Sequence, residues 1–168
     1  MSRNLEIKAS VPSLRFALAV SKRIRARRAG MLRQTDTYFN VTKGRLKLRE
    51  VNGREFELIY YERFNRKGSR FSDYFIVPLQ EPAVMRHMCS SLFGVKATVR
   101  KHRILFLYKN ARIHLDRVKG LGSFIEFEVI VRKGKVQARQ LMDFLVLEFG
   151  IARKSCIAGS YVDLLSNR

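Results

Sequence analysis

Cysteines, acidic residues and long apolar segments are all scarce in this sequence. The two cysteines, Cys89 and Cys156, do not form a Cys-x-x-Cys pair, so we expect neither a zinc ribbon nor a disulfide scaffold. No apolar run approaches the roughly 20 residues that a membrane-spanning helix needs. Glu6 and Lys8 interrupt the first apolar stretch, so we expect no secretory signal. Together these absences favour a reduced, intracellular protein, which we place in the cytoplasm.

The shortage of acidic residues leaves the chain strongly basic. It has 34 lysines and arginines against 14 aspartates and glutamates, a formal net charge of +20. Hydrophobic residues make up 46% of the 168 residues, so the chain is one domain with a packed core rather than a disordered basic tail. The charge predicts polyanionic partners: nucleic acid, phosphate-rich small molecules or an acidic membrane surface. Nucleic acid is not favoured, because no RNA-recognition, KH, zinc-finger or helix-turn-helix signature is present.

Most of the chain alternates polar and apolar residues, with the period of a strand. Breaks that contain glycine separate the alternating segments, at Gly53, Gly68 and Gly120 to Gly122. This spacing predicts five or six strands in an antiparallel sheet or barrel. The expected strands cover residues 4–9, 44–49, 57–63, 99–106, 111–116 and 124–131.

Two segments have helical spacing instead. A helix is expected from the Pro12 start signal to Gly30, and another over 137–149, where Gly150 ends the apolar stripe. A weaker pattern marks 82–93 as a third helix. We find no internal repeat or linker, so the sequence predicts a single α+β domain over residues 1–168.

The polar face of each strand carries almost one sign of charge, which is unusual for a solvated strand. Leu46 and Leu48, for example, oppose a face of three cations. Exposed rows of this kind would form a basic surface, whereas a closed barrel would point them into its lumen. Such a lumen must be wet, because unpaired buried charges are too costly, and it would suit a polyanion together with a divalent metal. The alternation alone leaves both arrangements open. The rows are Arg45, Lys47 and Arg49; Lys101 and Arg103; Glu126 and Glu128; and Glu6 and Lys8.

A series of motifs along nearly the whole chain resembles the CYTH superfamily, the triphosphate tunnel metalloenzymes. That superfamily includes class IV adenylyl cyclases, thiamine triphosphatases and inorganic tripolyphosphatases. One such motif would be weak support, but this many in the right order are strong, and the HLD and GLGSFIEFE segments are most similar to the cyclase branch. The motifs are NLEIK (4–8), QTDTYF (34–39), GRLKLRE (44–50), LIYYER (58–63), SDY (72–74), VRKHR (99–103), ARIHLD (111–116), GLGSFIEFE (120–128) and SYVDLL (160–165).

The resemblance implies a closed antiparallel barrel of eight strands with flanking helices, whose lumen binds a triphosphate and Mg²⁺ or Mn²⁺. The residues that it assigns to phosphate are Lys8, Lys47, Arg49, Arg63, Lys101, Arg103 and Arg112. Those that it assigns to the metal are Glu6, Glu126, Glu128 and, in second place, Asp116, and the residues closest to the chemistry would be Glu6, Lys8, Asp116 and Glu126. Arginine suits phosphate because its planar fork binds two oxygens, and hard divalent cations prefer carboxylates. No general base is assigned.

Asn4 departs from the family pattern, because it occupies the place of the first glutamate of the opening motif. An amide oxygen can bind a metal but brings no charge, so this departure predicts weaker or altered metal binding. Parity places Arg45 either in the tunnel or at its rim. The same argument places His114 on the same strand face as Arg112 and Asp116. There we favour a structural hydrogen bond over a role as metal ligand or base. The basic run over 21–28 is expected on a solvated helix face, with an RNA or acidic-lipid patch as the alternative.

The sequence therefore predicts a metal-dependent enzyme that acts on a triphosphate. The preferred reaction is that of a class IV adenylyl cyclase, which converts ATP to cyclic AMP and pyrophosphate. The alternatives are a hydrolase of tripolyphosphate, thiamine triphosphate or another organic triphosphate, and a non-catalytic binder of polyphosphate or nucleotide, which Asn4 motivates.

Overall fold

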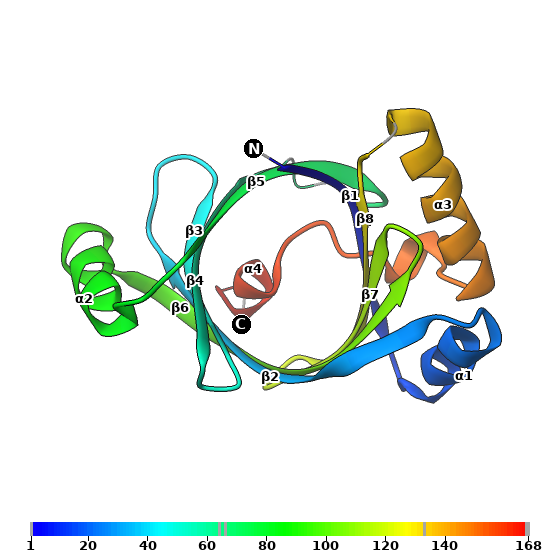
Figure 1. Ribbon diagram of the computed structural model, residues 1–168, viewed down its shortest axis with the longest axis horizontal. Coiled ribbons are helices and arrows are strands. Elements are labelled where there is room, and N and C mark those ends of the chain that lie inside the picture. The colour runs from blue at the N-terminus through cyan, green and yellow to red at the C-terminus, as the bar shows by residue number, and fades with distance from the viewer. Residues whose placement is uncertain (1, 64, 66, 133, 167–168) are drawn as a thin grey trace.

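Eight antiparallel strands close into a barrel that surrounds a lumen (Figure 1). The computed structural model describes residues 2–63, 65, 67–132 and 134–166. The order around the barrel is β1-β5-β4-β3-β2-β6-β7-β8. The α+β barrel that the family resemblance implied is therefore confirmed. The strands are β1 (Ser2–Val11), β2 (Arg27–Phe39), β3 (Arg45–Val51), β4 (Glu55–Glu62), β5 (Arg70–Pro78), β6 (Val95–Tyr108), β7 (Ala111–Val118) and β8 (Gly122–Ile130).

The six strands expected from alternation are all present, with ends that differ by a few residues. The two strands that alternation missed are β2 and β5, in which polarity does not simply alternate. The turn between β3 and β4 follows directly from its residues. Asn52 and Gly53 adopt positive φ angles of 54° and 71°, and Arg54 N–H donates to the Val51 carbonyl, which together form the tight turn that suits a hairpin.

Four α-helices and one short 3₁₀ segment lie around the barrel in the described part of the chain. They are α1 (Arg15–Arg23), α2 (Pro82–Phe93), α3 (Lys135–Glu148), the 3₁₀ segment Arg153–Ser155 and α4 (Tyr161–Ser166). The expected helices over 82–93 and 137–149 are confirmed as α2 and α3. None of the helices in the described residues is long and apolar enough to span a membrane.

The prediction that the first helix extends to Gly30 is wrong. Helix α1 ends at Arg23, and Arg25 then adopts a left-handed conformation with a φ of 56°. Residues from Arg27 onward join β2, where Arg27 pairs with Leu107 of β6. Sheet pairing therefore overrides the helical spacing. The basic run over 21–28 crosses from α1 into β2 rather than following one helix face.

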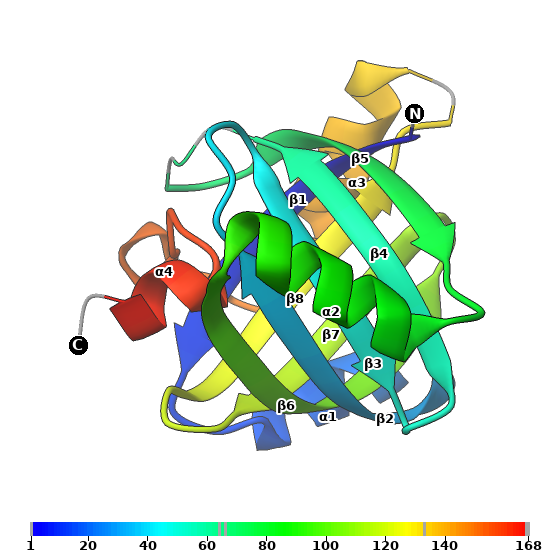
Figure 2. The ribbon, with the colours of Figure 1, turned by 90° about the vertical axis from the view of Figure 1, so that its left-hand side faces the viewer.

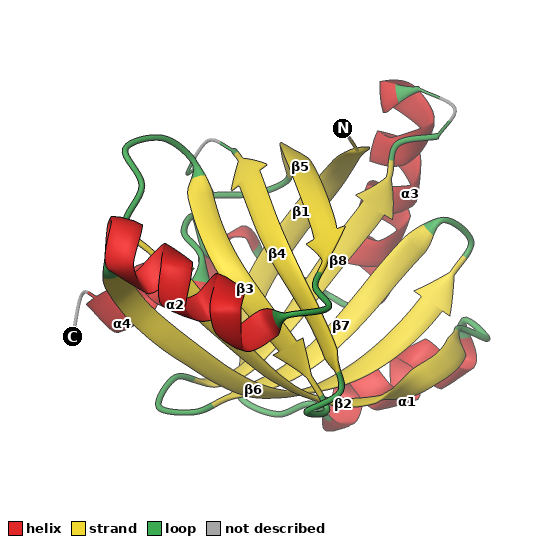
Figure 3. Cartoon of the chain, turned by 60° about the vertical axis from the view of Figure 1, so that its left-hand side comes forward, coloured by secondary structure: helices red, strands yellow, loops and turns green. Residues whose placement is uncertain are grey.

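Two apolar cores lie between the helices and the outer face of the barrel. Helices α1 and α3 cover β1, β7 and β8, and α2 covers β2, β3 and β4 on another side (Figures 1 and 3). Cys156 is buried in the first core and Cys89 in the second, both as free thiols. Because the outer face carries the apolar rows, the charged rows turn inward.

Helix α4 closes one end of the barrel. Figure 1, which looks along the lumen, shows α4 across it, and Figure 2 shows α4 at one side of the barrel in the perpendicular view. Tyr161 and Val162 of α4 pack against Tyr38, Val99 and Phe124, which line that end. The lumen is therefore accessible from the opposite end.

Leu145 provides a test of the α3 contact. Its side chain is fully buried against the barrel, so Leu145→Ala should lower the free energy of unfolding by about 2–5 kcal/mol. Leu147 on the same helix is 79% exposed, and Leu147→Ala should change stability by less than about 0.5 kcal/mol. Urea unfolding of both variants measures the difference. Equal losses would contradict the assigned face of α3.

Candidate functional site

The inward side chains form layers along the barrel. At the α4 end the layer is apolar and aromatic, and the middle layers are almost entirely charged. At the opposite end the strands carry Leu32, Val51, Ile76 and Leu105, of which Ile76 is 39% exposed. The cavity has a volume of about 370 Å³. It is therefore a charged chamber whose open rim carries these apolar side chains together with Glu55 and Glu57.

The register of the strands places opposite charges side by side across this chamber. Lys8 lies opposite Glu126 and Asp36 lies opposite Arg49. Each pair is joined by a close contact, 2.7 Å from Lys8 Nζ to Glu126 Oε1 and 3.0 Å from Arg49 Nε to Asp36 Oδ1. Cross-strand neighbours on one face lie close enough to interact directly, so the pairing itself makes these contacts.

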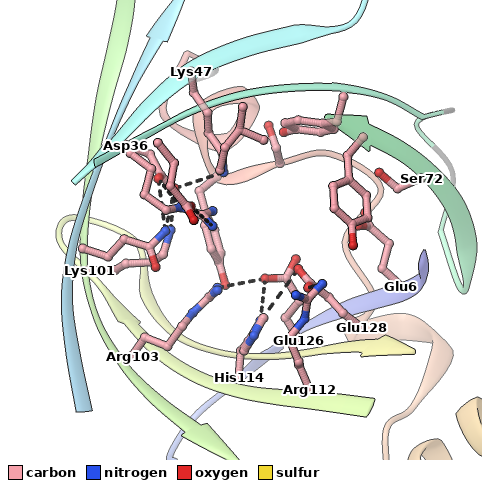
Figure 4. Close-up of a pocket in the computed structure, with 18 of the residues that line it drawn as sticks. Glu6, Asp36, Lys47, Ser72, Lys101, Arg103, Arg112, His114, Glu126 and Glu128 are labelled. Atoms are coloured by element: carbon pink, nitrogen blue, oxygen red, sulfur yellow. Dashed lines mark hydrogen bonds and ion pairs between the residues drawn. The ribbon is translucent and has the colours of Figure 1, made fainter. Parts of the chain in front are cut away.

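Asp36 is the centre of the first charged cluster (Figure 4). Its carboxylate accepts hydrogen bonds from Lys101 at 2.7 Å, Lys47 at 3.2 Å and Arg49 at 3.0 Å. The Gln34 amide donates a further bond at 3.0 Å. Burial alone would raise the pKa of Asp36, but the three cations outweigh burial and hold that pKa well below its usual value. Asp36 therefore stays ionised.

Lys47 is the member of this cluster with the most perturbed charge. Burial, together with the neighbouring charges of Arg49 and Lys101, lowers the pKa of Lys47 to about 7, although Asp36 opposes the shift. One carboxylate thus does not fully compensate three cations. An anion that enters this cluster would meet uncompensated positive charge.

Glu126 is the centre of the second cluster. It contacts Lys8 at 2.7 Å and Arg103 at 2.9 Å, and Arg103 also forms a two-pronged pair with Asp116 at 2.7 and 2.6 Å. Asp116 accepts a bond of 2.8 Å from the Tyr161 hydroxyl, which ties α4 to the chamber. Burial opposes ionisation of Glu126, yet the nearby charges of Lys8 and Arg103 hold its pKa well below the usual value.

The inner face of β1 carries fewer available carboxylates than the family motif predicts. Glu6 is bound by the guanidinium groups of Arg63 and Arg70, the latter at 3.2 Å. Asn4 is buried, and its Oδ1 has no hydrogen-bond partner. This wall of the chamber therefore offers an amide oxygen and a carboxylate already held by two arginines.

A group that could hold a metal ion lies on β7 and β8, of which β8 pairs directly with β1. Ligand atoms of His114, Glu126 and Glu128 all lie within 4.8 Å of one another. Burial opposes ionisation of Glu128, but the charges of Arg112 and His114 lower its pKa to about 2, so it is ionised at neutral pH. Burial and the charge of Arg103 lower the pKa of His114, which favours the neutral imidazole. Two carboxylates and a neutral imidazole are a suitable donor set for a divalent cation.

The structure brings nearly all of the predicted site residues into one chamber. Asp116 lies beside it, paired with Arg103 and Tyr161 rather than with the metal-capable group. Arg45 lies at the end of the barrel that α4 closes, where it donates a hydrogen bond of 2.7 Å to Asp163 of α4. The residues that line the chamber are Glu6, Lys8, Lys47, Arg49, Arg63, Lys101, Arg103, Arg112, Glu126 and Glu128.

Four charged residues at the chamber were not singled out from the sequence: Asp36, Arg70, and Glu55 and Glu57 near the open end. Asp36 lies within a quoted motif, and the parity of Gln34, Asp36 and Tyr38 would have placed it inward once β2 was identified as a strand. Arg70 begins β5 and is 1% exposed, in contact with Glu6. It gave no signal, because the residues before it resemble a loop.

The basic run lies outside the chamber. Lys22, Arg23, Arg25, Arg27 and Arg28 are exposed on the outer surface, and Arg23 contacts Glu148 at 2.8 Å. Much of the surplus charge of the chain is therefore separate from the lumen.

Comparisons with known proteins agree with this architecture. The model of the CYTH domain family matches residues 2–161, and a comparison with curated proteins finds no match. Among solved structures, the PH1012 protein from Pyrococcus horikoshii OT3 is similar with a TM-score of 0.84 and 20% identity, over 96% of this chain and 98% of that one.

Two further structures carry a functional description. A candidate adenylate cyclase from Vibrio parahaemolyticus has a TM-score of 0.79 and 18% identity, over 97% of each chain. A candidate adenylyl cyclase from Hippeastrum, HpAC1, described as having a dominant triphosphatase activity, has a TM-score of 0.71 and 12% identity, over 100% of this chain and 97% of that one. At these identities the likeness establishes the fold.

The lowered pKa of Lys47 predicts a dependence of stability on pH. Lysine in the unfolded chain titrates near 10.5 and Lys47 in the folded protein near 7, so between these values the unfolded state binds one more proton. The free energy of unfolding then rises with pH, by up to about 1.4 kcal/mol per unit. Lys47→Met removes this contribution. Urea unfolding at pH 7, 8 and 9 should therefore show the wild type gaining stability relative to the variant.

Lys119→Met, which removes an exposed lysine, serves as the control and should follow the wild type at each pH. If the difference between wild type and Lys47→Met is constant over this range, the pKa of Lys47 is not lowered.

Proposed function

Because the chain belongs to the CYTH domain family, we propose that it is a divalent-metal-dependent enzyme that binds a triphosphate in its barrel. The observation that carries the proposal is the charge of the chamber. Among the described residues, Glu55 and Glu57 lie near the open end of the chamber, and in its enclosed layers eight cations exceed five carboxylates, leaving a surplus of three positive charges there. The cations are Lys8, Lys47, Arg49, Arg63, Arg70, Lys101, Arg103 and Arg112, and the carboxylates are Glu6, Asp36, Asp116, Glu126 and Glu128.

The arginines and lysines have different parts in binding. Arg103 and Arg49 present planar forks that can each bind two phosphate oxygens, whereas Lys47 and Lys101 act as point charges. All four are held by carboxylates in the free protein, so phosphate binding exchanges one set of acceptors for another. The side chains are thereby oriented before the ligand arrives, which reduces the entropy lost on binding.

The group of Glu126, Glu128 and His114 would hold the metal. A divalent cation bound there would neutralise phosphate charge and stabilise the oxygens at the reacting phosphorus. Lys8 and Arg103, which share Glu126, would then be released toward phosphate oxygens. The chain's own contribution is to bind and orient the triphosphate and to limit its contact with water.

The apolar side chains at the open rim favour an organic triphosphate, and the reaction that we propose is cyclisation of ATP. Leu32, Val51, Ile76 and Leu105 would border the nucleoside, while the charged layers bind its phosphates. The ribose 3′-hydroxyl oxygen attacks the α-phosphorus, the bond from that phosphorus to the bridging oxygen breaks, and pyrophosphate leaves. The hydroxyl proton passes to solvent, and the products are cyclic AMP and pyrophosphate.

Hydrolysis is the second candidate. The same chamber would bind a triphosphate while water attacks its terminal phosphorus, the bond from that phosphorus to the bridging oxygen breaks, and the diphosphate leaves, with orthophosphate as the second product. The triphosphatase activity described for HpAC1, a structural neighbour, supports hydrolysis. The cavity of about 370 Å³ would also accommodate tripolyphosphate, which has no nucleoside. Asn4 supports a third candidate, a binder without turnover, because it brings no negative charge to β1, the strand beside the metal-capable group.

Product analysis separates these functions. The protein is incubated with ATP, tripolyphosphate or thiamine triphosphate, each with Mg²⁺ or Mn²⁺. Cyclic AMP with pyrophosphate supports the cyclase, and orthophosphate without cyclic AMP supports the hydrolase. Thermal stabilisation by tripolyphosphate without any turnover identifies a binder. No turnover and no stabilisation by any of the three would disprove the proposal.

Glu126→Ala should abolish turnover, because it removes both a metal ligand and the acceptor that orients Lys8 and Arg103. We expect a loss of at least about a hundredfold in kcat, with the folded state verified by circular dichroism. Glu81→Gln, at an exposed position before α2, is the matched control and should retain wild-type activity. Full activity of a folded Glu126→Ala would contradict the assignment.

Asp36→Asn tests the exchange of acceptors. Without this carboxylate, Lys47, Lys101 and Arg49 lose their common counter-charge, so the free protein should lose about 3–5 kcal/mol of stability. Tripolyphosphate should then raise the melting temperature of the variant more than that of the wild type, because it supplies the missing negative charge. Thermal shift assays with and without tripolyphosphate measure both effects. A smaller shift in the variant would mean that the cluster does not bind phosphate.

A further inference from the structure

His114 carries a buried nitrogen atom with no hydrogen-bond partner. Its side chain is 5% exposed, and its Nδ1 is fully enclosed. Buried polar atoms are nearly always paired, so an unpaired one indicates a group that is absent from the free protein. The parity of β7 turns this imidazole into the chamber, between Arg112 and Asp116 along the strand.

The unpaired nitrogen faces two carboxylates. Nδ1 lies 3.5 Å from Glu126 Oε2 and 3.9 Å from Glu128 Oε1 (Figure 4). These distances are too long for good hydrogen bonds. Ligands that bind one cation at about 2.0–2.2 Å lie roughly 3 Å from one another, so small side-chain movements would place a cation between all three. The register supports this arrangement, because His114 and Glu126 are directly opposed on β7 and β8.

The β1 wall is poorly equipped to supply the cation site by itself. Asn4 brings no charge there, and the carboxylate of Glu6 is bound by Arg63 and Arg70. The unpaired donor atom on β1 is the uncharged amide oxygen of Asn4, whereas β7 provides an unpaired nitrogen, Nδ1 of His114.

We propose that His114 is a nitrogen ligand that, with Glu126 and Glu128, forms the cation site of the chamber and makes it select Mn²⁺ over Mg²⁺. This inference rests on the proposed function, which requires a metal but does not specify its ligands. Mg²⁺ binds oxygen ligands almost exclusively, whereas an imidazole nitrogen favours first-row transition metals. Iron(II), cobalt(II) and zinc(II) belong to the same class, and Mn²⁺ is chosen as the probe for its electron paramagnetic resonance signal.

Cations of the chain compete for the same carboxylates in the free protein. Lys8 and Arg103 contact Glu126, and Arg112 contacts Glu128 at 2.8 Å. A polyphosphate draws these cations away, so the metal should bind more tightly when a polyphosphate is present. The bis-methylene analogue of tripolyphosphate is suitable as this second component, because it resists hydrolysis and contains no nitrogen.

The experiment measures nitrogen coordination directly and does not depend on turnover. Mn²⁺ and the analogue are added to the full-length protein in nitrogen-free buffer, and electron spin echo modulation is recorded. The wild type should show ¹⁴N modulation, and protein labelled with ¹⁵N-histidine should lose it in favour of ¹⁵N. His114→Asn, with His114→Gln as a second variant should the first not fold, should lose the modulation. His102→Asn, which changes an exposed histidine on the outer face of β6, should keep it.

Metal competition gives the second readout. Displacement of bound Mn²⁺ should require more Mg²⁺ in the wild type than in His114→Asn, by about tenfold, since the variant has only oxygen ligands. His102→Asn should match the wild type.

The outcomes separate this inference from the proposed function. Mn²⁺ that binds without histidine modulation, or with modulation that survives in His114→Asn, overturns the nitrogen ligand and leaves the metal-dependent function standing. No binding of Mn²⁺ or Mg²⁺ even with the analogue overturns both. Loss of the modulation in the His114 variants and in the ¹⁵N-labelled protein, but not in His102→Asn, supports the proposal.

Discussion

The structure depends on compensation of the charges that its closed sheet turns inward. A barrel with apolar rows outside must enclose its polar rows, and here those rows are charged. Isolated charges in such a chamber would prevent folding, so each carboxylate needs a cation within contact distance. The antiparallel register provides these partners, as between Lys8 and Glu126, Arg103 and Asp116, and Arg112 and Glu128. A shift of one residue in any strand would turn its charges into the apolar cores, which ties the register of the barrel to the charge pattern.

The same compensation prepares the chamber for a ligand. Each cation is already oriented by a carboxylate, and the acceptors are exchangeable for phosphate oxygens. Asp36 is the clearest case, because it holds Lys47, Lys101 and Arg49 in one cluster. Burial, together with the charges of Arg49 and Lys101, lowers the pKa of Lys47 there. For Glu126 the exchange would run the other way. Its carboxylate would keep its place and bind a metal ion in exchange for its present partners, Lys8 and Arg103. Under the proposed function, binding of metal and phosphate together would exchange internal ion pairs for ion pairs with the ligands.

The inward rows on β1, β3, β6 and β8 could be predicted from alternation, because there a single sign of charge faces a continuous apolar row. Alternation could not decide whether these charged rows form a basic surface or line a lumen. It shows which residues share a strand face, but not which face turns toward the inside of a barrel. Only the order of the family motifs indicated a barrel. The end of α1 was mispredicted because Arg27 to Gly30 fit helical spacing, while their pairing with β6 is a long-range contact that local pattern does not contain. Asp36 was missed because its role depends on three cations from two other strands, β3 and β6. His114 had the correct parity, but the absence of a partner for Nδ1 is visible only in three dimensions.

The layering of the chamber also constrains how a triphosphate can lie in it. Tyr161 of α4 seals the end beside Asp116, so an elongated ligand must enter from the rim of Leu32, Val51, Ile76 and Leu105. Entry with the terminal phosphate first brings that phosphate toward Lys47 and Lys101, which lie in the layer nearest α4. The α-phosphate then lies nearer the rim, on the level of Glu128 and His114, where an attached nucleoside contacts apolar side chains. Attack at the α-phosphorus and attack at the terminal phosphorus would thus occur at different depths, and a cation held by the proposed site on β7 and β8 would lie closer to the first. Under the proposed function, the position of this cation along the barrel would favour cyclisation over hydrolysis.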